Sequence, residues 1–295
     1  MNNLLKLDEV QMKKIKDLAS KLRLELGFTN ETPIANNIFT VLEKLNISLL
    51  EYPIEPVGEK PAFSAVLIYS KLEEGEDIAF IGLNTADYYD KQIFAIAHEL
   101  YHFKTKTRSH LSRPSEDQKD TVEIKANRFA AEFLLPEDKL KGLIINEFKT
   151  YNLTRIQNKA LLRFIARLQC DWWLPYRSIV KRLLEIDSIS EKQYQSLYSI
   201  DERHDDSSYG RIAKATKEEV FEKLNTITRN IGTSPSNIEI IIRNFEENRI
   251  TEEEFNNLLR MFNKQPEDFN YKVEVDEKDI AELNSFFNED NNNEN

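Results

Sequence analysis

The stretch Ala97-His98-Glu99-Leu100-Tyr101-His102-Phe103 contains the pattern His-Glu-x-x-His and closes an apolar run of helical character that begins at Ile93. Residues four apart on an α-helix lie on the same face, so His98 and His102 can direct two imidazole nitrogens at one metal ion. Glu99 then lies beside the open coordination position, where it can accept the proton of a metal-bound water. The stretch therefore predicts a metal-binding helix.

The pattern His-Glu-x-x-His also arises by chance, and a zinc hydrolase needs a third protein ligand. A second segment of helical character follows and ends at Pro136. Its apolar face consists of Ala126, Phe129, Ala130 and Phe133. Glu123 opens this segment about twenty residues beyond His102, a distance that lets a second helix carry a carboxylate back to the metal. The helix dipole alone also favours a glutamate in the first turn. Beside His-Glu-x-x-His, we favour the ligand role for Glu123.

The two blocks together resemble the ImmA/IrrE family of zinc metallopeptidases: His98-Glu99-x-x-His102 and Glu123-x-x-Ala126-Asn127-x-Phe129-Ala130-Ala131-x-x-Leu134-Leu135-Pro136. The resemblance covers roughly residues 30–200. It implies that His98, His102 and Glu123 bind Zn²⁺ and that Glu99 is the catalytic base. Tyr101 departs from the family pattern, which usually has Gly at this place. A tyrosine there leaves the ligand spacing unchanged, but it could crowd the groove or alter the packing beside the site.

The resulting hypothesis is a zinc-dependent endopeptidase in which Glu99 accepts a proton as hydroxide attacks the scissile carbonyl. The resemblance implies a regulatory protein as the substrate, typically a DNA-binding repressor of a mobile element such as a prophage, or of a stress regulon. The alternative is a non-proteolytic zinc-fold binding or regulatory module of a phage or toxin–antitoxin system. Tyr101 and additional helices near the C-terminus give this alternative some weight.

Composition limits the other classes of function. The chain has 295 residues, of which 51 are acidic and 40 basic, so its net charge of −11 argues against general nucleic-acid binding. The single cysteine, Cys170, excludes an intramolecular disulfide and fits a reducing compartment. Residues 1–10 lack the apolar core of a signal peptide, and no run is long and apolar enough for a membrane span. We therefore expect a cytoplasmic protein that acts on a protein partner.

Periodicity predicts an α+β fold that is mostly helical, with a small sheet preceding the zincin-like helix. Amphipathic helices are expected over residues 8–26 and 33–45, and strands over 47–53, 62–69 and 78–83. An exposed edge of such a sheet can hold an extended substrate by backbone hydrogen bonds. Further helices are expected over residues 139–148 and 155–168.

The predicted domains are a metallopeptidase domain over residues 1–200 and a C-terminal helical module over residues 201–295. The boundary follows from the segment 201–210, whose Asp-Asp-Ser-Ser run is typical of a linker. Helices are expected near 217–229, 236–247 and 251–262, and the Asn/Glu-rich tail 288–295 is predicted to be disordered.

Two questions stay open at the level of sequence. The oxyanion formed when hydroxide attacks a peptide carbonyl needs a stabilising group, for which Tyr101, Arg108 and His110 are candidates. For His110 we favour the alternative of a solvated histidine in a loop. Residues 172–197 have the rhythm of a helix-turn-helix, which would suit a DNA-binding regulator. We favour a scaffold role for them, because their first helix offers only Arg177, Lys181 and Arg182 as cations.

Overall fold

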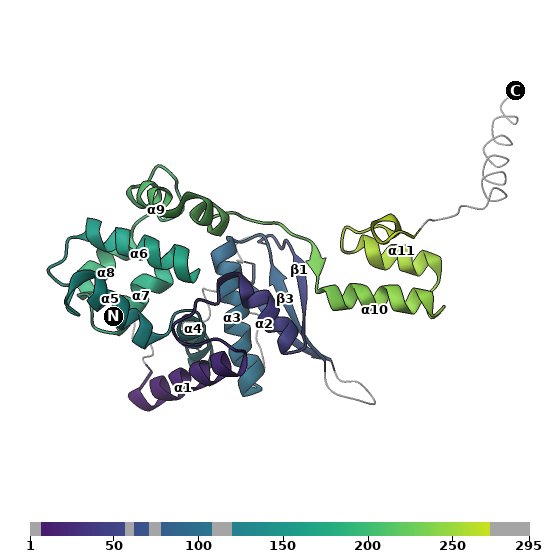
Figure 1. Cartoon of the computed structure of the whole chain (residues 1–295), viewed down its shortest axis with the longest axis horizontal. Coiled ribbons are helices and arrows are strands. Elements are labelled where there is room, and N and C mark those ends of the chain that lie inside the picture. The colour runs from purple at the N-terminus through teal and green to yellow at the C-terminus, as the bar shows by residue number, and fades with distance from the viewer. Residues whose placement is uncertain (1–6, 57–61, 71–77, 108–119, 272–295) are drawn as a thin grey trace, which may run out of the picture. The chain divides into compact units, whose positions relative to one another are not determined.

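The computed structural model of the chain describes residues 7–56, 62–70, 78–107 and 120–271 (Figure 1). It begins with α1 (Glu9–Glu25), the 3₁₀ turn η1 (Ala35–Asn37) and α2 (Ile38–Lys44). The Asp8 side chain caps α1 by accepting a hydrogen bond from the Gln11 backbone N–H at 2.7 Å, and the Gln11 side chain accepts one from the Asp8 backbone N–H at 3.0 Å. The second predicted helix starts later than expected, because Ala35 has a left-handed φ of 45° that interrupts the helical backbone.

A four-stranded sheet follows, with the strand order β2-β3-β1-β4. Its strands are β1 (Ile47–Tyr52), β2 (Ala65–Ser70), β3 (Ile78–Asn84) and β4 (Gly232–Thr233). Strand β1 runs parallel to β3, whereas β2 pairs antiparallel with β3 and β4 pairs antiparallel with β1. Buried residues alternate along β1 and β3, so one face of the sheet is covered, and α2 and α3 pack there. The three predicted strands are present, and β4 is an addition.

The remaining helices of the first part of the chain are α3 (Tyr89–Thr105), α4 (Thr121–Leu134), α5 (Glu137–Phe148), α6 (Asn158–Trp172), α7 (Tyr176–Glu185), α8 (Glu191–Tyr198) and α9 (Ser208–Leu224). Helix α4 packs on α3 and on α1, and α9 packs on α6. The predicted α+β class, mostly helical with a small sheet before the His-Glu-x-x-His helix, is confirmed. No helix in the described part of the chain has the length and apolar character needed to cross a membrane.

The chain divides into two compact units, residues 1–234 and 235–295. This division differs from the predicted boundary at residue 200, because the segment after α8 is part of the first unit. Tyr209 at the start of α9 is fully buried. Further along, the backbone N–H of Tyr89 donates to the carbonyl of Thr226 at 2.9 Å, and that of Leu49 donates to Ser234 Oγ at 2.8 Å. Within its described residues, the second unit contains α10 (Pro235–Glu246), α11 (Glu252–Arg260) and the turn η3 (Pro266–Phe269). The predicted disordered tail lies outside the described residues.

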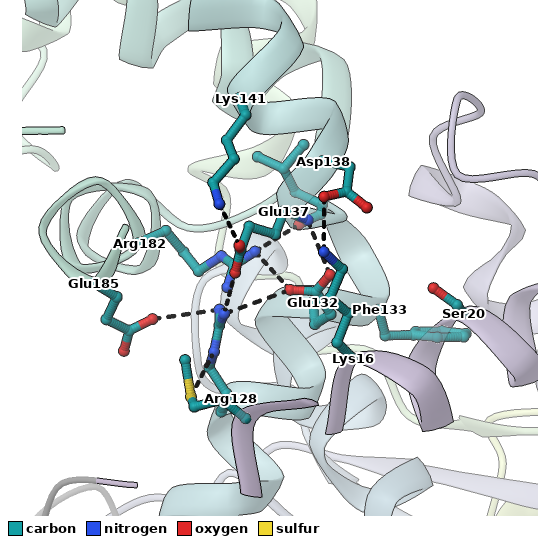
Figure 2. Close-up of polar contacts among 12 residues, drawn as sticks. Lys16, Ser20, Arg128, Glu132, Phe133, Glu137, Asp138, Lys141, Arg182 and Glu185 are labelled. Atoms are coloured by element: carbon teal, nitrogen blue, oxygen red, sulfur yellow. Dashed lines mark hydrogen bonds and ion pairs between the residues drawn. The ribbon is translucent and has the colours of Figure 1, made fainter. Parts of the chain in front are cut away.

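A network of ion pairs, centred on buried arginine side chains, joins α4 to α5 and α7 (Figure 2). Arg182 on α7 contacts Glu132 on α4 at 2.7 Å, and both residues are 1% exposed. Arg128 on α4 reaches Glu137 on α5 at 2.9 Å and Glu185 on α7 at 3.4 Å. Burial raises the pKa of Glu132 to about 6, against the opposing effect of the Arg128 charge. The network fixes α4 against two neighbouring helices on the side away from the sheet.

Replacing Arg182 with Met should lower the free energy of unfolding by about 3 kcal/mol or more, because it leaves Glu132 buried without its closest cation. Urea denaturation followed by circular dichroism measures this change. Lys181→Met on the same helix is the matched control. Because Lys181 is exposed, this substitution should change the free energy of unfolding by less than about 0.5 kcal/mol. Equal effects of the two substitutions would contradict a structural role for the buried pair.

Candidate metal centre

Helix α3 carries the first part of the site, and its apolar side fixes it on the sheet. The fully buried residues on this side are Ile93, Ile96, Ala97 and Leu100. At the first turn, the buried carboxylate of Asp90 pairs with Arg203 at 3.0 Å and accepts a hydrogen bond from Gln169 Nε2 at 3.0 Å. Because α3 is held at its start and along one side, His98 and His102 leave it in fixed directions.

Helix α4 brings the second part of the site against α3. Asp120 caps its N-terminus by accepting a hydrogen bond from the Val122 backbone at 2.7 Å. Glu123 lies in the first turn and is 3% exposed. Ala126, Phe129 and Ala130 are fully buried, so the apolar face of α4 keeps this turn close to α3.

The three side chains that the sequence singled out as ligands meet at one point. His98 Nε2 lies 2.9 Å from Glu123 Oε2 and 3.2 Å from His102 Nε2. His102 Nε2 lies 3.5 Å from Glu123 Oε1. One ligand atom from each residue lies within 4.8 Å of the others, and all three residues are buried. This group could hold a metal ion.

The charges of the group are strongly coupled. Burial favours the neutral form of Glu123, but the contacts with His102 and His98 outweigh burial and lower the pKa of Glu123 to about 2. Burial also disfavours a charged imidazole at His98. The hydrogen bond to Glu123 and the charges of Glu99 and Glu123 outweigh it, so the pKa of His98 is raised. The site thus favours positive charge beside the carboxylate.

The donor set fits a cation. Glu123 Oε1 is buried and has no hydrogen-bond partner among the described residues, which is costly for a carboxylate oxygen unless a cation neutralises it. Two imidazole nitrogens 3.2 Å apart also repel each other when both present lone pairs. Two imidazoles and a carboxylate form one of the ligand sets typical of catalytic zinc.

Glu99 lies one residue after His98 and is fully buried. Its charge contributes to raising the pKa of His98, so its carboxylate is close enough to interact with the group. All four residues that the sequence indicated therefore lie within a single buried region of α3 and α4.

Tyr101 is 8% exposed, and its side chain packs against α4. Its ring lies edge-on to His102, with 5.8 Å between centroids, and 5.7 Å from the ring of Phe129 on α4. Of the effects considered for Tyr101, the structure shows packing beside the site. Two other candidates for oxyanion stabilisation, Arg108 and His110, lie outside the described residues, so that question stays open.

Two polar partners of the histidines were missed in the sequence analysis. His98 Nδ1 lies 3.0 Å from Asn127 Oδ1, and His102 Nδ1 lies 3.0 Å from Thr107 Oγ1. Asn127 follows Glu123 by four residues on α4, so helical spacing could have revealed it. Thr107 follows the end of α3, and its place depends on the left-handed backbone of Lys106 (φ 53°), for which the sequence offers no signal.

Comparison with known families agrees with this site. A family model of metallopeptidases, described as the IrrE N-terminal-like domain, matches residues 62–166. The match spans β2, β3 and helices α3, α4 and α5, and so includes His98, Glu99, His102 and Glu123. The resemblance found in the sequence is confirmed. Neither the comparison with curated proteins nor that with solved structures found a match.

The coupling between Glu123 and His98 is open to direct measurement in the metal-free protein. Because Glu123 raises the pKa of His98, the substitution Glu123→Gln should lower that pKa and leave His98 neutral at a pH where the unsubstituted protein holds a proton there. An NMR titration of labelled histidine side chains follows each imidazole, since the chain contains only four. An unchanged titration curve of His98 in the Glu123→Gln variant would show that the Glu123 carboxylate does not raise the pKa of His98.

Proposed function

We propose that this member of the ImmA/IrrE family is a zinc-dependent endopeptidase that cuts a regulatory protein. The observation that carries the proposal is the buried group His98, His102 and Glu123, with the buried carboxylate of Glu99 next to it. The family match supports a metallopeptidase-like activity, and the zinc ion, the residue roles and the substrate are the further content of the proposal.

In this proposal, His98 and His102 hold Zn²⁺ through Nε2, and Glu123 holds it through a carboxylate oxygen. The facing nitrogens support this assignment, as does Glu123 Oε1, which is buried without a hydrogen bond and lies 3.5 Å from His102 Nε2. A zinc ion bound there supplies Lewis acidity, which activates water for attack on a peptide carbonyl.

Glu99 has the role of general base and then general acid. It accepts a proton from the attacking water and later passes a proton to the leaving amine. Its place in the chain supports this role, because the residue after the first histidine of the motif lies beside the ligand positions rather than among them. Full burial keeps bulk water from competing for the proton.

The proposed substrate class is a DNA-binding repressor of a mobile element or of a stress regulon. Repressors carry basic surfaces that contact phosphates, so an acidic surface on the enzyme favours encounter with them. The acidic charge is unevenly distributed: residues 235–295 contain sixteen acidic and six basic residues, which accounts for −10 of the net charge of −11. The second unit is therefore the part of the chain best suited to attract a basic protein.

A role in reading DNA directly receives less support. Arg182, one of the three cations on α7, is 1% exposed and pairs with Glu132. Arg177 pairs with Glu202 at 3.1 Å. Only Lys181 of the three lacks such a pairing in the described contacts and is exposed, which is a small cationic surface for phosphate binding.

The substitution Glu99→Gln should reduce proteolysis by at least about 100-fold and leave zinc content unchanged, because it removes the proton acceptor but no ligand. His102→Ala should lose zinc as well as activity. Activity is measured as new protein N-termini, detected by mass spectrometry, after incubation with an extract of native proteins, and zinc by elemental analysis. Glu218→Gln, an exposed glutamate on α9 of the first unit, is the matched control.

Full cleavage by the Glu99→Gln variant would contradict the mechanism, and unchanged zinc content in His102→Ala would remove that residue from the ligand set. If the unsubstituted protein binds zinc and yields no new N-termini, the hypothesis of a non-proteolytic zinc-fold module is better supported than that of a peptidase.

Neutralising three exposed glutamates of the second unit should raise KM for a basic repressor substrate several-fold with little change in kcat, because the charges act on encounter and not on chemistry. The triple variant combines Glu239→Gln, Glu247→Gln and Glu253→Gln. Its matched control neutralises Glu191, Glu218 and Glu219, which are exposed on the first unit. Steady-state kinetics at low and high salt measure both, and equal shifts in KM would show that the charge of the second unit has no special part.

A further inference from the structure

Three side-chain and backbone groups form a chain of hydrogen bonds that ends at His102. Thr105 Oγ1 lies 2.7 Å from the backbone carbonyl of Tyr101. Thr105 Oγ1 and Thr107 Oγ1 are 2.9 Å apart. Thr107 Oγ1 lies 3.0 Å from His102 Nδ1.

The direction of every bond in this chain follows from counting protons. A carbonyl oxygen can only accept, so Thr105 must donate its single hydroxyl proton to Tyr101. Thr105 Oγ1 can then only accept from its neighbour, and Thr107 must donate its own single proton to Thr105. Thr107 has no proton left for the imidazole, so its oxygen accepts one from His102 Nδ1.

We propose that Thr107 is a positioning residue that holds neutral His102 in the tautomer with the proton on Nδ1, with Thr105 and the Tyr101 carbonyl setting the direction of the chain. The unprotonated nitrogen of His102 is then Nε2, the atom that lies 3.2 Å from His98 Nε2 and 3.5 Å from Glu123 Oε1. In the opposite tautomer, a proton would occupy the place where a ligand needs its lone pair. The purpose of this arrangement, though not the tautomer itself, rests on the proposed metal site.

The backbone after α3 makes the contact of Thr107 with His102 possible. Lys106 ends the helix in the left-handed conformation, with φ 53°. This turn takes the chain out of the helix directly after Thr105. Thr107, the residue after Lys106, can therefore reach the imidazole of His102. The ring of Tyr101 packs edge-on to that imidazole, so His102 is restrained both in ring orientation and in the place of its proton.

His98 is held from a different element. Its Nδ1 lies 3.0 Å from Asn127 Oδ1, which can only accept, so this bond also favours a proton on Nδ1. Helix α4 therefore provides the orienting group for His98, and the turn after α3 provides the orienting group for His102.

The experiment uses the full chain and three variants at Thr107 and Thr105. Thr107→Val keeps the shape of the side chain and removes the oxygen, whereas Thr107→Ser restores the hydroxyl. Thr105→Val removes the acceptor for the Thr107 proton, so that Thr107 can donate to Nδ1 instead. The matched control is Thr216→Val, which removes a hydroxyl that donates to the Ile212 carbonyl on α9 at 2.8 Å.

Two measurements are made on each protein. Two-bond proton–nitrogen NMR correlations of the metal-free protein at about pH 9, above the pKa of an ordinary imidazole, report which nitrogen of His102 carries the proton. Competition with a chromophoric chelator reports zinc affinity. We expect Nδ1–H at His102 in the unsubstituted protein, loss of that preference in Thr107→Val and Thr105→Val, and zinc affinity lower by about 10- to 100-fold in Thr107→Val. Thr107→Ser and Thr216→Val should match the unsubstituted protein within about threefold.

An Nε2–H tautomer at His102 in the unsubstituted protein would overturn the proposal, as would a Thr107→Val variant that keeps both tautomer and zinc affinity. Failure of the proposed function looks different. In that case the unsubstituted protein binds no zinc, while the Nδ1–H tautomer and its dependence on Thr107 are still observed.

Discussion

The closeness of two imidazole nitrogens and one carboxylate in a buried space is the constraint on which this structure depends. His98 Nε2, His102 Nε2 and Glu123 lie within hydrogen-bonding distance or slightly beyond, and all three residues are at most 3% exposed. Such a group is unfavourable in a protein interior unless protons or a cation balance it. The protein therefore has to hold α3 and α4 firmly against each other at this point.

The means of holding α3 and α4 are spread over much of the first unit. Helix α3 is packed on the sheet and tied at its first turn to Arg203 through Asp90. Helix α4 is tied at its other end, where the guanidinium of Arg23 donates to the carbonyl of Phe133 and also, at 2.6 Å, to the carbonyl of Thr29. The ion pairs of Arg128 and Arg182 secure its outer side (Figure 2).

The candidate site could be predicted from the sequence because its chemistry depends on short, regular spacing. The four-residue separation of His98 and His102 has the same geometric consequence in any helix. Glu123 was found because a third ligand was needed and a second segment of helical character opens with this carboxylate. The class of fold and three of the strands could be predicted from the periodicity of apolar residues, which is also a short and regular pattern. Asn127 was within reach of this reasoning, since it lies one helical turn after Glu123.

The features that the sequence did not reveal depend on contacts distant in the chain. Strand β4 is two residues long and exists because residues 232–233 meet β1, far earlier in the chain. The boundary between units was placed at residue 200 because a run of small polar residues has the composition of a linker, yet Tyr209 and Leu224 of α9 are buried. Thr107 depends on a left-handed residue, Lys106, that has no glycine signal. Local pattern cannot indicate such features.

The most direct test of the account is a crystal structure of the zinc-soaked protein with anomalous data collected on both sides of the zinc absorption edge. The account predicts one strong anomalous peak between α3 and α4, about 2.0–2.2 Å from His98 Nε2, His102 Nε2 and an oxygen of Glu123. An anomalous peak only at other residues, or no peak between α3 and α4 while the protein remains folded, would contradict the central claim that these three side chains form a metal site.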